Sequence, residues 1–161
     1  MKIITAKMDD LKMLASVERQ CFPPAEAATE EVLRSRLRYY PDHFRLLFDG
    51  DRLVAFVDGF VTDTKDLTDD MYEDASMHNE QGSWQMIFGV NTIPEYRRRG
   101  CAAMLIRNVI EDSKKEGRKG VVLTCKEELI PYYSRFGFVN EGITSKSVHG
   151  GVSWYQMRLS F

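Results

Sequence analysis

The stretch WQMIFGVNTIPEYRRRGCAAMLIRNVI, residues 84–110, connects an apolar run to an amphipathic segment through a basic turn. The run WQMIFGVN predicts a buried strand, which Pro94 stops. After the turn, five apolar side chains recur at the spacing of one helix face: Ala102, Leu105, Ile106, Val109 and Ile110. A strand, a short turn and an amphipathic helix in succession are typical of an α/β domain.

Before this stretch the pattern predicts a strand, two helices and a hairpin. The strand covers residues 3–6, and the first helix, LKMLASVERQ, ends before a loop over residues 22–28, where two prolines disfavour helix. Thr29 is expected to cap the second helix, which Pro41 ends. HFRLLF and RLVAFVDGFV then form the hairpin, with its turn at residues 49–51.

The segments on either side of the predicted helix complete the fold. Residues 62–82 are rich in acidic side chains and predict a solvated loop. GVVLT predicts a short strand and LIPYYSRF a short helix; residues 138–143 and 152–159 predict the last two strands, with a turn at residues 149–151. This order predicts one mixed α/β domain over residues 1–161, with helices on both faces of one sheet.

Length and charge narrow the class of protein. A chain of 161 residues is expected to form one domain around a single core. Its 22 basic and 24 acidic residues give a net charge of -2, which excludes a strongly positive field for non-specific nucleic-acid binding. The three cysteines have no spacing typical of a metal site, so we expect reduced thiols and no metal. No segment resembles a signal peptide or a membrane span, so a cytoplasmic protein without membrane contact is expected.

The basic turn before the helix carries the sharpest chemical signal. The first backbone N–H groups of a helix are unpaired and its dipole favours negative charge, so this junction can hold a diphosphate. Gly100 lets the backbone approach a ligand closely, and the small Ala102 and Ala103 leave room for it. Positive charge comes from three arginines: Arg97, Arg98 and Arg99. From these residues alone, a solvated surface patch is an equally good interpretation.

The spacing Arg97-x-x-Gly100-x-Ala102 resembles the (Gln/Arg)-x-x-Gly-x-(Gly/Ala) acetyl-CoA signature of the GNAT acyltransferases. It is neither a P-loop nor a dinucleotide fingerprint. Other segments are similar to the arylalkylamine (serotonin) N-acetyltransferase branch of this family: SVERQCFPP, DGDRLVAFVDG, LTDD, MHNEQG and LTCKEELIPYYSRFGF. The resemblance implies a mostly antiparallel sheet of about seven strands, with a splayed pair of strands at a cofactor cleft.

The resemblance also implies where acetyl-CoA binds. The pantetheine arm would hydrogen-bond to the strand at Val90, Asn91 and Thr92, and the N–H near Val90 would act as an oxyanion donor to the thioester oxygen. The pyrophosphate would lie against the turn and the first helical residues: Arg97, Arg98, Arg99, Gly100, Cys101, Ala102 and Ala103.

The catalytic residues carry over only in part. Tyr133 falls where the family has the tyrosine that protonates the CoA thiolate, and its neighbour Tyr132 provides an internal control. The two histidines that act as the base in the serotonin-acetylating members correspond to Met86 and Phe88, which cannot accept a proton. The base stays open between the loop residues His78 and Glu80, acidic residues such as Glu26 or Asp70, and bulk water with proximity supplying the acceleration.

The residues expected around the acceptor are mostly apolar. A wall is expected from Phe22, Pro23, Pro24, Met86, Phe88 and Trp154. The acidic loop over residues 63–80 would attract a cation, so a small amine with an apolar or aromatic body is favoured. Cys101 and Cys125 are expected to be buried filler residues and not acyl carriers, because no histidine lies near either in the sequence.

Two functions from different classes follow. The first is an acetyl-CoA-dependent N-acetyltransferase that works by direct attack in a ternary complex. The second is a catalytically weak CoA-binding sensor or partner module, which the missing histidine pair motivates. The last strand, SWYQMRLSF, is compatible with a homodimer contact or with pairing inside one chain, so monomer and homodimer both stay open.

Overall fold

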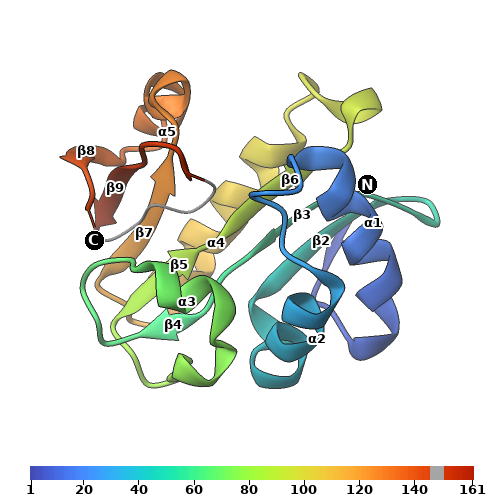
Figure 1. The fold of residues 1–161 in the computed structure, drawn as a ribbon, viewed down its shortest axis with the longest axis horizontal. Helices are drawn as coiled ribbons and strands as arrows, with labels where there is room; N and C mark the ends of the chain where they lie inside the picture. Colours follow the sequence, from blue (N-terminus) through green and yellow to red (C-terminus); the bar gives the residue numbers. More distant parts are fainter. Residues whose placement is uncertain (146–150) are drawn as a thin grey trace.

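The computed structural model describes residues 1–145 and 151–161 and divides the strands between two sheets (Figure 1). The first, in the order β1-β2-β3-β6, contains β1 (Lys2–Ile4), β2 (Phe44–Asp49), β3 (Arg52–Asp58) and β6 (Gly89–Thr92). The second, in the order β4-β5-β7-β9-β8, contains β4 (Val61–Thr62), β5 (Trp84–Ile87), β7 (Gly120–Cys125), β9 (Tyr155–Ser160) and β8 (Val139–Ile143). Within the described residues only β5 and β7 pair in parallel, which confirms the mixed, mostly antiparallel fold class.

Helices cover both faces of the strands. The α-helices of the described chain are α1 (Leu11–Cys21), α2 (Glu30–Tyr39), α3 (Asp69–Glu73), α4 (Cys101–Lys115) and α5 (Ile130–Ser134). Short 3₁₀ segments are η1 (Met8–Asp10), η2 (Pro41–His43), η3 (Ala75–Met77), η4 (Pro94–Tyr96) and η5 (Glu127–Leu129). α1 packs on β3 and β6, whereas α4 packs on β2, β3, β6 and β7. Figure 1 shows α1 and α2 in front of the first sheet and α4 behind it.

The two amino-terminal helices form for the reasons that the sequence indicates. Thr29 accepts a hydrogen bond from the N–H of Val32 at 3.2 Å, which confirms the expected cap of α2. In α1 the side chains of Leu11, Leu14 and Ala15 are buried on one face. The next position of that apolar stripe is Glu18, which is also buried. A carboxylate therefore enters the interior between apolar neighbours.

The strand expected over residues 84–91 is interrupted by a β-bulge. On one side of it Val61 lies opposite Gln85. On the other side Asp58 lies opposite Gly89, so two residues of the first strand face three of the second. The extra residue bends the chain: β5 pairs with β7, and among the described strands β6 pairs only with β3. The single sheet expected from the sequence is therefore two sheets joined at this bulge.

The acidic segment over residues 62–82 is more ordered than the charge count indicates. It contains α3 and η3, and Leu67 and Met71 within it are almost fully buried. Tyr72 is buried as well and shares a hydrogen bond with Thr124 of β7 at 2.7 Å. The expectation of a solvated loop was wrong because these apolar side chains anchor the segment to the second sheet.

The first and last strands differ from the expectation only in where they begin and end. β1 starts and ends earlier than residues 3–6, and β9 starts at Tyr155 where the pattern predicted residue 152. Most of the turn expected at residues 149–151 lies outside the described residues. Within the described residues, no helix combines the length and the apolarity that spanning a membrane requires.

Candidate functional site

A cavity of about 340 Å³ opens where β6 and β7 separate. Gly89 and Val90 of β6 line one side of it, and Leu123 and Cys125 of β7 line the other. The loop between α1 and α2 forms a third wall, and Tyr133 of α5 a fourth. The expected splayed pair of strands is therefore present, and the space between them is a cavity.

Part of the backbone of β6 faces away from its partner strand β3. The N–H of Ile93 donates to the carbonyl of Val54 at 3.0 Å, and Asn91 lies opposite Phe56 in the same ladder. Alternate residues of an antiparallel strand direct their N–H and C=O groups to opposite sides. The intervening residues Val90 and Thr92 therefore direct these groups away from β3, and Val90 lines the cavity.

The amino terminus of α4 presents a second set of free donors. Gly100, the residue before the helix, has φ of 80°, and Arg98 has φ of 63°. The N–H of Met104 donates to Gly100 at 3.0 Å; among the described residues no acceptor pairs with the N–H groups of residues 98–103. A Cβ on Gly100 would meet no atom within 4 Å, so positive φ, and not crowding within the chain, favours glycine here. The sequence predicted unpaired donors at this helix start, and donors of this kind suit an anion.

The arginines of the turn are exposed, and two of them have partners. The Nε of Arg97 donates to the carbonyl of Thr92 at 3.1 Å, which links the turn to β6. The guanidinium of Arg99 lies 4.7 Å from the ring centre of Tyr96. Cys101, at the start of α4, is buried, as expected for a filler residue.

A carboxylate that the sequence analysis did not consider lies in the cavity wall. Glu18, at 4% exposure, accepts a hydrogen bond from the N–H of Ala28 at 3.0 Å. A Cβ built on Gly89 of β6 would lie 3.8 Å from Oε1 of Glu18, so the carboxylate borders the bulge. Burial raises the pKa of Glu18 to about 7, and the charge of Asp58 adds to the rise. A carboxylate that titrates near neutrality is a candidate proton acceptor.

The Glu18 cluster contains two further buried charges. Arg36 of α2 donates from Nη1 to Oδ2 of Asp58 at 2.9 Å and from Nη2 to the carbonyl of Tyr72 at 2.7 Å. Asp58 is fully buried, and the guanidinium lies 5.2 Å from the ring centre of Phe88. One guanidinium faces two carboxylates, so the cluster is short of positive charge whenever Glu18 is ionised.

Tyr133 lies where the resemblance implies an acid, in the wall of the cavity at 6% exposure. Burial raises its pKa well above the ordinary value for a phenol, so it keeps its proton at neutral pH. Tyr132 packs edge-on against it with ring centres 5.2 Å apart, and is not among the described residues of the cavity wall. The two adjacent tyrosines therefore occupy different surroundings.

A family model described as "Acetyltransferase (GNAT) family" matches residues 11–138. The chain belongs to the GNAT acetyltransferase family. The serotonin N-acetyltransferase of Mesocricetus auratus is 25% identical over 148 residues, covering 89% of this chain and 70% of that protein. At this identity the arylalkylamine branch stays a prediction.

Solved structures give the same fold. The loading GNATL domain of CurA from Lyngbya majuscula has a TM-score of 0.85 at 17% identity, covering 99% of this chain and 96% of that one. A GphF GNAT-like decarboxylase in complex with isobutyryl-CoA has a TM-score of 0.80 at 17% identity, covering 99% of both chains. At these identities the likeness extends to the fold alone.

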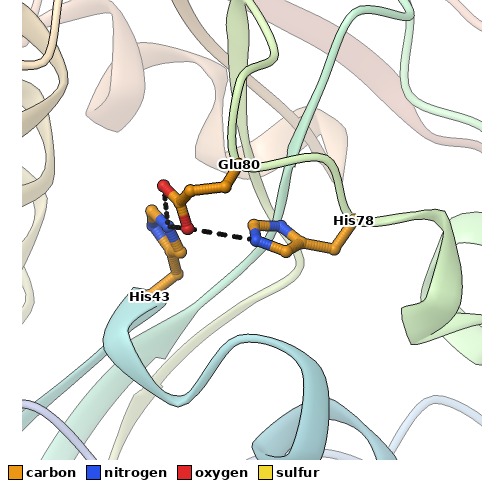
Figure 2. A group of neighbouring side chains, drawn as sticks. All are labelled: His43, His78 and Glu80. Carbon is orange, nitrogen blue, oxygen red and sulfur yellow. Dashed lines mark hydrogen bonds and ion pairs between the residues drawn. The ribbon is translucent and has the colours of Figure 1, made fainter.

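Two of the bases considered for this GNAT protein, His78 and Glu80, lie outside the described cavity wall. Figure 2 shows them grouped with His43. Glu80 approaches His43 of η2, whose Nε2 is 2.9 Å and 3.0 Å from the two carboxylate oxygens. His78 places Nε2 at 3.2 Å from Oε1, and Arg118 donates to Oε2 at 2.8 Å. These hydrogen bonds hold the pKa of Glu80 below its ordinary value against the opposing effect of burial. We call Glu80, His43, His78 and Arg118 the Glu80 cluster; within it, both carboxylate oxygens of Glu80 have partners.

The tautomer of His78 bears on whether the Glu80 cluster fits a metal ion. The N–H of Val61 donates to Nδ1 of His78 at 3.1 Å, so the ring proton is on Nε2, the nitrogen that faces Glu80. A metal ion needs a lone pair at that nitrogen. His43, His78 and Glu80 lie close enough together for shared ligation, but their hydrogen bonding does not fit it.

The other acidic candidates differ from each other. Glu26 lines the cavity and pairs with Lys126. Asp70 accepts a hydrogen bond from the hydroxyl of Thr68 at the surface, apart from the described wall. Of the bases that sequence reasoning considered, only Glu26 reaches the cavity.

The expected acceptor wall is correct in part. Phe22, Pro23, Phe88 and Trp154 line the cavity. Met86 is fully buried in β5 before the bulge, and Pro24 is exposed; neither belongs to the described wall. The bulge explains the difference between Met86 and Phe88, because it turns the chain between them. Cys125 lines the cavity, but burial raises its pKa to about 11, which keeps the thiol protonated and disfavours an acyl-carrier role at neutral pH.

Proposed function

We propose that the protein is an acetyl-CoA-dependent N-acetyltransferase that acetylates a primary amine by direct attack in a ternary complex. The observation that carries this proposal is the position of the cavity. It lies between the separated strands β6 and β7, and the chain that leaves β6 leads directly into the unpaired donors of α4. A thioester carried on a polyphosphate needs a cavity for the thioester and backbone donors for the phosphates.

Each part of acetyl-CoA has matching groups on the chain. The N–H groups of residues 98–103 and the arginines of the turn suit the pyrophosphate. The unpaired backbone groups of Val90, beside Asn91 and Thr92, suit the amides of the pantetheine arm. The N–H of Val90 suits the oxygen of the thioester, where one such donor supplies roughly 3 kcal/mol to the transition state.

Glu18 supplies the base that the Met86 and Phe88 positions lack. An alkylamine enters as an ammonium ion, and Glu18, with its pKa raised to about 7, takes a proton from it. The amine nitrogen then attacks the thioester carbon, the C–N bond forms, and the C–S bond breaks. The nitrogen loses a second proton to solvent, and this loss balances the proton that the departing sulfur gains from Tyr133, which solvent reprotonates. The ammonium ion also supplies the positive charge that the Glu18 cluster lacks, so the same carboxylate attracts the acceptor.

Tyr133 protonates the departing CoA thiolate. A phenol with a raised pKa is a weak acid, but a thiol in this cavity is weaker than usual as well. Burial raises the pKa of Cys125, in the same wall, to about 11. The same surroundings would raise the pKa of the CoA thiol, which brings donor and acceptor closer.

The acceptor has an apolar or aromatic body. Four aromatic side chains line the cavity besides Tyr133: Phe22, Tyr72, Phe88 and Trp154. Their faces suit a ring or an alkyl chain, and the carboxylate of Glu18 suits the amino group. A small cationic amine matches both.

The test is CoA thiol release from acetyl-CoA with a panel of arylalkylamines, polyamines and aminoglycosides. Tyr133→Phe is expected to lower kcat by roughly 100-fold. Tyr132→Phe is the matched control, because it removes a phenol from the neighbouring residue outside the described wall. Equal turnover in both variants would remove Tyr133 from the mechanism. CoA binding by calorimetry without turnover of any amine would favour the sensor or partner module.

A further inference from the structure

The cavity wall contains an ammonium ion that belongs to the protein. Lys126, the residue after β7, places Nζ 2.9 Å from Oε1 and 3.1 Å from Oε2 of Glu26. The same ammonium lies 6.0 Å from the ring centre of Trp154. All three residues line the cavity. A carboxylate and an aromatic ring around one ammonium ion are the usual elements of a site for amine cations.

Burial indicates which member of this group is fixed and which can leave. The Glu26 side chain is 7% exposed, whereas the Lys126 side chain is 36% exposed. A buried carboxylate needs a cation nearby, but it does not need this particular one. The lysine ammonium sits on a flexible four-carbon stem and can move into water. Exchange of Lys126 for another ammonium ion would leave the charge of the wall unchanged.

The site shares a loop with the Glu18 cluster. Glu26 is two residues before Ala28, whose N–H donates to Glu18. Two residues of chain span at most about 7 Å, so Glu26 and the N–H that Glu18 accepts from lie on one short piece of the same wall. Short aliphatic diamines carry two ammonium groups on this scale.

We propose that Glu26 and Trp154 form a second ammonium subsite, which Lys126 fills until an acceptor with two amino groups displaces it. This inference rests on the proposed function: the reacting amino group binds at Glu18 and the distal one at Glu26. It assigns the acceptor to the short aliphatic diamines and polyamines. Lys126 is then an internal competitor that monoamines do not displace.

The experiment compares 1,4-diaminobutane and 1,5-diaminopentane with butylamine and pentylamine, by thiol release and by calorimetry in the presence of CoA. The wild type is expected to prefer each diamine in kcat/KM. Glu26→Gln should lower kcat/KM for the diamines roughly tenfold more than for the monoamines. Lys126→Met should lower KM for the diamines only. Glu127→Gln, which removes an exposed carboxylate next to Lys126, is the control.

The two readouts separate the failure of this inference from that of the proposed function. Equal kcat/KM and equal affinity for diamines and monoamines would overturn the subsite. Unchanged diamine binding in Glu26→Gln would overturn it as well. Diamine binding that Glu26→Gln abolishes, without thiol release from any amine, would support the subsite and overturn the acetyl transfer.

Discussion

Glu18 and Glu80 are two carboxylates in opposite situations. Glu80 is half exposed and faces three cationic or hydrogen-bonding partners, His43, His78 and Arg118. Glu18 is almost fully buried; it accepts a backbone hydrogen bond from Ala28 and faces the charge of Asp58. The pKa of Glu80 is lowered and that of Glu18 is raised. A carboxylate with many donors is a structural anion, and one with few donors in a cavity is ready to take a proton.

This difference shows why Glu18 is a better candidate for the base than Glu80. In the sequence, Glu80 and His78 are separate candidates for the base in the loop before the predicted strand. In the structure the Nε2 atoms of both histidines lie against the carboxylate of Glu80, which engages that carboxylate away from the cavity. Glu18 has no histidine in its own turn of helix, where its titratable neighbours are Arg19 and Cys21. Its reactivity comes from the surroundings that the fold supplies.

The largest expected effect is on turnover. Glu18→Gln should lower kcat/KM at pH 7 by roughly 100- to 1,000-fold, because the ammonium loses its proton acceptor. Glu80→Gln should change it by less than about twofold, because the Glu80 cluster lies outside the cavity wall. Steady-state thiol release measures both. The reverse order would exchange the roles of the two carboxylates.

The next effect is on stability and has opposite signs in the two clusters. The pKa of Glu18 rises from 4.5 to about 7 on folding, so the folded state favours the protonated form. Folding stability is therefore lost as pH rises from 4.5 to 7, and Glu18→Gln should restore about 3 kcal/mol at pH 8 and nothing at pH 4. The pKa of Glu80 is lowered, so its contribution is present above pH 4.5 and is lost as pH falls. Glu80→Gln should therefore destabilise at pH 8. Urea unfolding at both pH values checks this; equal signs at pH 8 would contradict it.

The smallest effect is a shift in the pH profile. The rising limb of kcat/KM should lie near pH 7, where Glu18 loses its proton. Asp58→Asn removes a charge that raises this pKa, so the limb should move to lower pH. Asp112→Asn is the matched control, because Asp112 pairs with the buried Arg45 outside the described cavity wall. A limb that stays in place in Asp58→Asn would separate Asp58 from the titration of Glu18.

Much of the fold follows from local sequence signals. The Thr29 cap, the hairpin between β2 and β3, and the amphipathic pattern of α4 each fix one element. The division into two sheets depends on one extra residue between Gln85 and Gly89, and no local signal shows which strand gains it. The order within residues 62–82 was masked by their charge, although Leu67 and Met71 at helical spacing were an available signal.

The part of the candidate site that consists of backbone groups could be predicted from the sequence. The part that consists of side chains could be predicted less well. The turn and the start of α4 depend on Gly100 and on helix geometry, which the sequence shows directly. Glu18 was missed although it lies in the segment SVERQCFPP, because that segment was taken only as a sign of family resemblance. Its position in the apolar stripe of α1, four residues after Leu14, was the sign that it points inward. Arg36 of α2 occupies the same kind of position between Leu33 and Leu37.

The bulge between β5 and β6 also determines how the molecule can open. The chain passes directly from β5 of one sheet to β6 of the other. The two sheets are therefore covalently linked at the point where they begin to separate. Widening this separation would require breaking the ladder of β5 with β7 or unbending the chain at residues 86–88. The width of the opening between β6 and β7 is therefore set by the backbone. A change in which acceptors enter the cavity would therefore require substitutions of the side chains at its rim, because the backbone at the bulge keeps its geometry.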